Sequence, residues 1–145
     1  MAGHAPIPEL VAQRTSSGTY TVRNSAGAEL RIGAPGAAGA FSPVELLQAA
    51  LAGCASLSAE AQLVSKLGDE FEALTTVNAV YDSEQNRLEK LVTRIAVDSS
   101  ELDQSDHDRL VSSTMRIIDK LCTVKRSLNA GIEATTELAR QEFGN

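Results

Sequence analysis

Two short runs near the start of the chain carry the alternating pattern of β-strands. They span residues 19–24 and 28–33, and the small residues 25–27 between them predict a hairpin. Residues 1–17 hold two of the four prolines and show little pattern, so we expect an irregular arm there. The segment 33–40 is rich in glycine and is expected to form a loop.

Apolar residues recur at helical spacing over the next stretch, from Pro43 to about Leu67. The predicted apolar stripe consists of Leu47, Ala50, Leu51, Cys54, Leu57, Ala61 and Val64. Ser42 is a good N-cap, Pro43 is favoured at the first helical position, and Glu45 completes a capping box. Gly68 is expected to cap the other end. The sequence therefore predicts one long helix with well-defined ends.

The second half of the chain alternates again before it returns to helical spacing. Residues 71–82 and 86–98 are predicted as two longer strands, because apolar side chains in the second run recur at every other position. A second helix is expected over about 106–121, and a separate short helix after Cys122. Residues 131–138 are predicted as a last strand.

This order of strands, helix, strands, helix and strand is typical of an α+β fold. A length of 145 residues fits one ordinary domain, so we expect a single domain over residues 1–145. An apolar fraction of 43% and a charged fraction of 22% are those of a globular protein. Only three Phe, two Tyr and no Trp are present, so the core must be built from aliphatic side chains.

The charge and the apolar stretches argue against several classes of partner. The net charge is −6 and no block of Lys and Arg occurs, which disfavours binding to nucleic acid. The start of the chain lacks the pattern of a signal peptide, and the apolar run 46–57 is too short to cross a membrane. His4 and His107 have no companions at metal-ligand spacing, so no metal site is expected. We therefore expect a soluble cytoplasmic protein.

Cys54 and Glu45 each allow a structural and a chemical interpretation. Glu45 fits the capping box, and Cys54 lies on the apolar stripe, where it could simply fill space. Composition alone favours two buried hydrophobic cysteines over a redox pair. Glu45 and Cys54 are nine positions apart, which puts them on opposite sides of a straight helix. They would lie roughly 13 Å apart along its axis, so a shared site needs a helix break, a bridging residue or a second subunit.

The stretch SPVELLQAALAGCASL, residues 42–57, resembles the first-cysteine motif of the OsmC/Ohr family of osmotically inducible and organic hydroperoxide resistance proteins. The stretch KLCTVKRSL around Cys122 resembles the second-cysteine motif of that family. The resemblance covers nearly the whole chain, from about Arg14 to Leu138. It implies an OsmC-like fold with an N-terminal hairpin, a long central helix carrying Cys54, further strands and a second helix, assembled as an intertwined homodimer.

The same resemblance implies a thiol-dependent peroxidase with no metal and no organic cofactor. Cys54 would be the peroxidatic cysteine and Cys122 the resolving one, so that turnover passes through a Cys54–Cys122 disulfide. Glu45 would pair with an arginine of the N-terminal region. Arg14, followed by TSSGTYTV, matches that arginine best.

Arg23 and Arg31 remain alternatives to Arg14, because both lie on the predicted hairpin. The thiolate attacks peroxide, a neighbouring guanidinium stabilises that thiolate, and a carboxylate can hold the guanidinium in a two-point bridge. With an arginine between them, Glu45 and Cys54 could share a site without direct contact. The resulting sulfenic acid condenses with a second thiol, and an external dithiol of the lipoyl or thioredoxin type reduces the disulfide.

The sequence departs from the family pattern beside both cysteines. Thr123 stands where the family often has proline, and Ala55 stands where an aromatic residue often follows the first cysteine. With so few rings, the chain looks more like the OsmC or OsmC-like branch than the Ohr branch. Organic hydroperoxides are the expected substrates, with hydrogen peroxide as a further one. The alternative is a non-catalytic OsmC-like protein that senses redox state or binds a small ligand.

Overall fold

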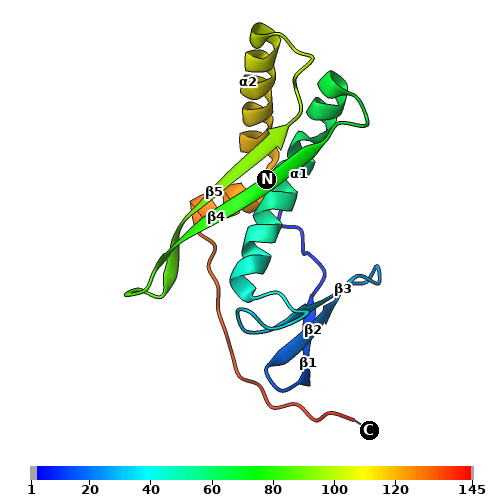
Figure 1. The fold of residues 1–145 in the computed structure, drawn as a ribbon. Helices are drawn as coiled ribbons and strands as arrows, with labels where there is room; N and C mark the ends of the chain where they lie inside the picture. Colours follow the sequence, from blue (N-terminus) through cyan, green and yellow to red (C-terminus); the bar gives the residue numbers. More distant parts are fainter. Residues whose placement is uncertain (1–2, 145) are drawn as a thin grey trace. The chain divides into compact units, whose positions relative to one another are not determined.

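The first three strands form an antiparallel sheet in the order β1-β2-β3 (Figure 1). The structure is a computed structural model and describes residues 3–144. Strand β1 spans Val11–Ser16, β2 spans Thr19–Arg23 and β3 spans Glu29–Ile32. The predicted hairpin is confirmed by β2 and β3. The predicted irregular arm is wrong for β1, whose six residues are all exposed and therefore lack the apolar alternation that predicts a strand.

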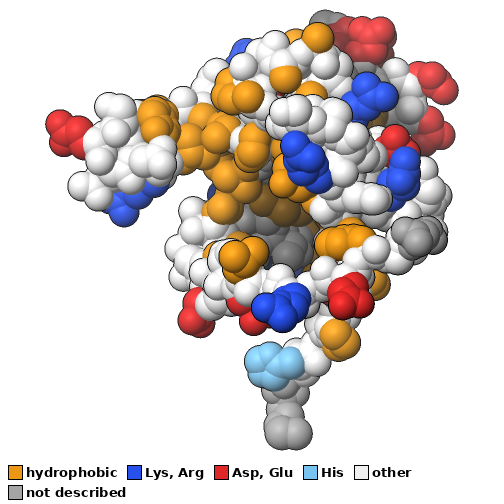
Figure 2. All heavy atoms as spheres, turned by 90° about the horizontal axis from the view of Figure 1, so that it is seen from below, with side chains coloured by type: hydrophobic (Ala, Val, Ile, Leu, Met, Phe, Trp, Pro, Cys, Tyr) orange, Lys and Arg blue, Asp and Glu red, His pale blue; other side chains and the backbone are white. Residues whose placement is uncertain are grey.

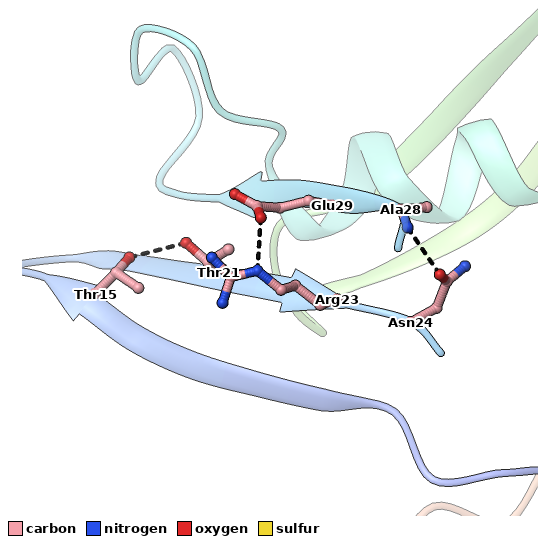
Figure 3. A network of polar contacts seen from close by, with 6 residues as sticks. All are labelled: Thr15, Thr21, Arg23, Asn24, Ala28 and Glu29. Carbon is pink, nitrogen blue, oxygen red and sulfur yellow. Dashed lines mark hydrogen bonds and ion pairs between the residues drawn. The ribbon is translucent and has the colours of Figure 1, made fainter. Parts of the chain in front are cut away.

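Polar side chains add to the backbone pairing of this sheet (Figure 3). The Thr15 and Thr21 hydroxyl oxygens lie 3.0 Å apart, and Arg23 Nε donates to Glu29 Oε2 over 2.6 Å. In the turn, Asn24 Oδ1 accepts the Ala28 N–H at 2.9 Å. Several side chains that bond within this sheet are therefore polar, and polar residues do not contribute to the hydrophobic pattern by which strands are predicted.

Helix α1 spans Pro43–Leu67, as predicted. Its first turn is closed by Ser42 and Glu45, and at its end the Gly68 N–H donates to the Val64 carbonyl over 2.8 Å. Gly68 has φ +92°, a conformation that glycine adopts without strain.

The predicted apolar stripe of α1 is largely wrong. The residues that the structure buries recur at a spacing of four and are Leu51, Ala55, Ala59 and Leu63. Leu57 of the predicted stripe is 75% exposed. Because Leu and Ala occur on nearly every side of this helix, its periodicity could not reveal which side packs.

Strands β4, Ala73–Asp82, and β5, Arg87–Val97, confirm the two longer strands that the sequence predicts, and they pair in a two-stranded sheet. Gln48 of α1 donates to the Val77 carbonyl over 2.8 Å, and the Ser56 and Thr75 hydroxyl oxygens lie 2.8 Å apart. These bonds attach α1 to β4 at two places along its length.

Helix α2 spans Gln104–Leu121 and begins two residues before its predicted start. The Asp103 carboxylate caps it by accepting the Asp106 N–H at 2.8 Å. Helix α3 spans Thr123–Ala130 and confirms the predicted short helix. Cys122 alone separates the two helices. No helix within residues 3–144 has both the length and the apolar character needed to cross a membrane.

Residues 131–144 contain no strand, so the last strand predicted over 131–138 is wrong (Figure 1). A strand needs a neighbour that accepts and donates its backbone hydrogen bonds. No described strand supplies these bonds, and the apolar side chains of Ile132 and Leu138 are left 67% and 102% exposed.

The described residues group into two compact units. One comprises the residues up to Ala52 together with 76–94, and the other comprises 53–75 together with the residues from Ile95 onward. Helix α1 and strands β4 and β5 contribute residues to both units. The α+β class is confirmed, whereas a single domain over 1–145 stays a prediction.

Candidate functional site

Two free thiols lie in the same unit, and each influences the pKa of the other. Cys54 is half-buried near the middle of α1. Cys122 is fully buried where α2 ends and α3 begins. The two cysteines that the sequence singles out are therefore brought together by the fold.

The pKa of the Cys54 thiol is lowered, chiefly by a hydrogen bond from the Val124 N–H. Burial acts in the opposite direction and raises this pKa. Further lowering comes from the Cys122 thiol, the Thr123 N–H and the Ser58 hydroxyl. Four donors thus favour the thiolate of Cys54.

The two backbone donors belong to the first turn of α3. Cys122 is the N-cap residue of this helix, but its side chain makes no capping hydrogen bond. The first N–H groups of a helix have no partner within it, and the positive end of its dipole favours an anion. The Cys54 sulfur therefore acts as an acceptor for α3 from a different helix, in the place that a side-chain cap usually takes.

The pKa of the Cys122 thiol is raised, first by its burial and further by the hydrogen bond and negative charge of the Cys54 thiolate. The Lys125 N–H and the Lys125 charge oppose this rise without cancelling it. The two thiols are therefore inequivalent. Cys54 is the one that ionises first, and Cys122 keeps its proton and donates to it.

The residues beside Cys54 differ in the space around them. A Cβ atom placed on Gly53 would meet no other described atom within 4 Å, so that side of the helix is open. Ala55, by contrast, is only 2% exposed, and an aromatic side chain at that position would need the core to move.

Glu45 lies in the other unit and has the structural role that its position predicts. Its Oε1 accepts the Ser42 N–H at 2.9 Å, and the Glu45 N–H donates to Ser42 Oγ over 3.2 Å. The bond from the Ser42 N–H is the main reason why the pKa of the Glu45 carboxyl is lowered, and the Ser42 hydroxyl adds to it. The capping box is confirmed, and pairing of Glu45 with an arginine stays a prediction.

The three candidate arginines differ in whether they form an ion pair. Arg23 forms an ion pair with Glu29, and its guanidinium is committed to the sheet. Arg14 on β1 and Arg31 on β3 are exposed, and neither makes an ion pair with any residue in the range 3–144. The assignment of Arg14 to the thiolate is thus left as a prediction, with Arg23 the weakest of the three.

The histidines and acidic residues do not assemble a metal site in the described part of the chain. Nowhere between residues 3 and 144 do three or more His, Cys, Asp or Glu side chains gather around a common point. The His107 Nδ1 lies 2.8 Å from the Ser99 hydroxyl oxygen, a bond that fixes the start of α2.

Sequence reasoning missed the donors that act on Cys54. The Val124 and Thr123 N–H groups are backbone atoms, which no motif of side chains can reveal. The signal that could have found them is the predicted break between two helices at Cys122, since a helix start beside a thiol favours its ionisation. Ser58 carried a weaker signal, because it follows Cys54 by one helical turn.

Comparisons with known proteins agree with this fold. A family model described as OsmC-like protein matches residues 36–137, a range that includes both cysteines. An uncharacterized protein of Mycobacterium tuberculosis is 31% identical over 132 residues, which cover 91% of this chain and 96% of that protein. An uncharacterized protein of Mycobacterium bovis matches with the same identity and coverage.

Two solved structures share the fold at lower identity. An OsmC-like protein from Mycoplasma pneumoniae superposes with a TM-score of 0.64 and 14% identity, over 87% of this chain and 89% of that one. The organic hydroperoxide resistance protein OhrB of Bacillus subtilis superposes with a TM-score of 0.51 and 18% identity, over 82% of this chain and 87% of that one. From the matched family model and the mycobacterial relatives, the chain belongs to the OsmC-like protein family.

Proposed function

We propose that the protein is a thiol-dependent peroxidase that reduces organic hydroperoxides, and hydrogen peroxide as a further substrate. The observation that carries this proposal is the pair of adjacent free thiols whose pKa values move in opposite directions. A peroxidatic thiol must be a thiolate at neutral pH, and a resolving thiol must wait beside it in its protonated form. Membership of a family that includes organic hydroperoxide resistance proteins supports the substrate class.

The proposed reaction uses only the two cysteines and an external dithiol. The Cys54 thiolate attacks the terminal oxygen of ROOH, the O–O bond breaks, and the alkoxide leaves as ROH after taking up a proton. Cys54 is then a sulfenic acid, two electrons more oxidised than the thiolate. The Cys122 sulfur attacks this sulfenic sulfur, the S–S bond forms, and the hydroxyl leaves as water with the proton from Cys122.

An external dithiol closes the proposed cycle. One of its sulfurs attacks the Cys54–Cys122 disulfide and forms a mixed disulfide, and its second sulfur displaces the protein thiol. The dithiol is oxidised, and both cysteines return to the reduced state. Dihydrolipoyl and thioredoxin-type dithiols fit this step, and both belong to a reducing compartment such as the cytoplasm.

A homodimer is proposed as the working unit. Large apolar side chains remain at the surface, and Figure 2 shows many of them on the face that it displays. Leu57 on the helix that carries Cys54 is 75% exposed, and Phe41 just before that helix is 50% exposed. An obligate two-fold interface would cover such residues. The exposed residues 131–138 also have the strand pattern that a second chain could pair with.

The decisive experiment is peroxide consumption at steady state. Cumene hydroperoxide and hydrogen peroxide are each supplied with dihydrolipoamide or with a thioredoxin system, and decay of the peroxide is followed. The proposal expects many turnovers for the parent protein, none for Cys54→Ser, and normal turnover for Ser56→Ala as a matched control. A sensor or ligand-binding protein would instead be oxidised once and stop, and that result would overturn the proposal.

A further inference from the structure

A groove with a volume of about 530 Å³ lies between the second half of α1 and helix α2. All of its lining residues belong to the same compact unit. Gln62 Nε2 of α1 donates to Ser113 Oγ of α2 over 2.8 Å, so a side-chain bond joins the two helices where they line the groove. On α2 the polar lining residues recur at a spacing of three or four, which places them on one face of that helix. They are Ser105, Asp108, Arg109, Ser112, Ser113 and Arg116.

The charge of this groove is opposite in sign to that of the chain. The chain has 19 acidic and 13 basic residues, whereas the charged residues that line the groove are Lys66, Arg109, Arg116 and Asp108. Lys66 and Arg116 make no ion pair with any residue in the range 3–144. Arg109 reaches the Asp106 carboxylate only at 4.0 Å, and its side chain is 81% exposed. The positive charges of the groove are therefore available to a ligand.

We propose that this groove binds a small sugar phosphate, whose phosphate is held by the basic side chains and whose sugar hydroxyls are held by serines and Asp108. A guanidinium presents donors that match the oxygens of a phosphate, and an ammonium adds a further positive charge. Arg116 belongs to α2 and Lys66 to α1, so both walls of the groove supply a cation to the same anion.

The rest of the lining favours a sugar as the group that carries the phosphate. The hydroxyls of Ser105 and Ser112 can each donate and accept. Gln104 Nε2 donates to one oxygen of the Asp108 carboxylate over 2.8 Å, and the second oxygen can accept from a ligand hydroxyl. None of the described residues that line the groove is aromatic, so a nucleobase would find no ring to stack on. The volume is that of a small-molecule pocket and is larger than a lone phosphate ion needs.

Exposed basic side chains along one helix are usually solvated and by themselves indicate no ligand. This groove differs because its basic residues come from two helices and outnumber its acidic residue in an acidic chain. It is also separate from the two thiols. Gln62 lies eight positions beyond Cys54, about 12 Å along the axis of α1. The inference therefore goes beyond the proposed peroxidase, and neither proposal depends on the other.

The test is isothermal titration calorimetry of the full chain with ribose-5-phosphate and glucose-6-phosphate as probes. Ribose, glucose and inorganic phosphate are titrated separately as the two halves of each probe. At least one sugar phosphate should bind in the micromolar to millimolar range and more tightly than inorganic phosphate, whereas the free sugars should not bind. The affinity should fall as salt is added, because charges in an open groove are screened.

Matched variants locate the binding in the groove. Lys66→Gln and Arg116→Gln should each weaken binding about tenfold, the effect of losing a hydrogen bond to a charged group. Lys120→Gln is the control, because Lys120 is exposed on α2 and does not line the groove. It changes the net charge by the same amount and should bind like the parent. Circular dichroism and the midpoint of thermal unfolding verify that each variant is folded.

The inference would be overturned if neither sugar phosphate binds in the millimolar range. It would also be overturned if inorganic phosphate binds as tightly as the sugar phosphates, since the groove would then hold an adventitious ion only. An equal loss of affinity in Lys120→Gln would show that net charge, and not the groove, attracts the probe, which overturns the inference as well.

Discussion

Ser42 and Glu45 satisfy each other at the start of α1, since Glu45 Oε1 accepts the Ser42 N–H at 2.9 Å while Ser42 Oγ accepts the Glu45 N–H at 3.2 Å. Such a reciprocal bond explains Glu45 without any catalytic role. The family resemblance implies a second role as the partner of an arginine. The two roles use different properties of the side chain, because a cap needs an acceptor oxygen and an arginine partner needs a negative charge.

The first prediction separates these roles. Glu45→Gln keeps an acceptor oxygen for the Ser42 N–H, so the midpoint of thermal unfolding should stay within about 2 °C of the parent. Loss of the charge should lower peroxide reduction about tenfold, since the two-point bridge to arginine is lost. Ser42→Ala is the matched control: it should lower the free energy of unfolding by about 1 kcal/mol while activity remains. Full activity in Glu45→Gln would show that Glu45 acts only as a helix cap and has no role as the partner of an arginine.

The second prediction concerns the fate of the oxidised sulfur. One equivalent of peroxide should convert the parent protein to a Cys54–Cys122 disulfide, which mass spectrometry detects as a loss of two hydrogens. In Cys122→Ser the same treatment should leave Cys54 as sulfenic acid, and excess peroxide should drive it to sulfinic acid. Two intact thiols in the parent after this treatment would contradict the mechanism.

The third prediction is a pH profile. Only the thiolate reacts, so the rate with peroxide rises with pH through the Cys54 pKa and then levels off. Because hydrogen bonds from the start of α3 lower that pKa, the midpoint of the rise should lie below the ordinary thiol value of about 8.5. The Cys122 pKa is raised, so its ionisation should not appear in this range. Stopped-flow rates between pH 5 and pH 9 provide the measurement, and a midpoint above the ordinary value would count against the assignment.

The fourth prediction uses the departure from the family pattern at Thr123. Thr123→Pro should fold normally, because Cys122 is extended (φ −72°, ψ 95°) and proline is favoured at the first helical position. Proline removes the Thr123 N–H, one of the donors to Cys54, while the Val124 N–H remains. The thiolate fraction at neutral pH should fall about two- to threefold, the effect of a partly exposed hydrogen bond. Thr123→Ala keeps the N–H and should match the parent, so an equal loss in both variants would show that the Thr123 side chain is responsible.

The local sequence predicts those features whose hydrogen bonds join residues close together in the chain. The ends of α1 were predicted because Ser42, Glu45 and Gly68 act within a few residues of the atoms they cap. The same holds for the hairpin of β2 and β3 and for the break at Cys122. Both cysteines were identified as a pair through the family resemblance, and composition alone favoured the opposite conclusion.

Features that depend on distant partners were not predictable in the same way. The exposed strand β1 has no apolar alternation, and the tail 131–138 has the alternation but no described neighbour. The side of α1 that carries Ala55 is buried because other elements pack against it. The side that carries Leu57 is equally apolar in the sequence but is exposed. The N–H of Val124 acts on Cys54 only because α3 starts where the fold brings it to α1.

The fifth prediction concerns which arginine stabilises the Cys54 thiolate. Arg14→Ala should leave the fold intact, raise the Cys54 pKa and slow peroxide reduction, because β1 is an exposed strand whose Arg14 makes no described ion pair. Arg23→Ala should instead leave the Cys54 pKa unchanged and lower the free energy of unfolding by no more than about 1 kcal/mol, because its ion pair with Glu29 is exposed. If Arg31→Ala reproduces the kinetic defect and Arg14→Ala does not, the arginine was assigned wrongly by spacing and the thiol chemistry stands.

Subunit exchange then tests whether the site is shared between two chains. In a two-fold dimer whose sites combine Arg14 and Glu45 of one chain with Cys54 of the other, inactive Arg14→Ala and inactive Cys54→Ser should complement each other. Each mixed dimer would contain one intact site of two, so equimolar exchange should restore about a quarter of the parent activity. The control mixes Arg14→Ala with the Arg14→Ala/Cys54→Ser double variant, which cannot supply the arginine and should stay inactive. Inactive mixed dimers in the first experiment, with exchange verified by mass spectrometry, would mean that each site draws these residues from a single chain.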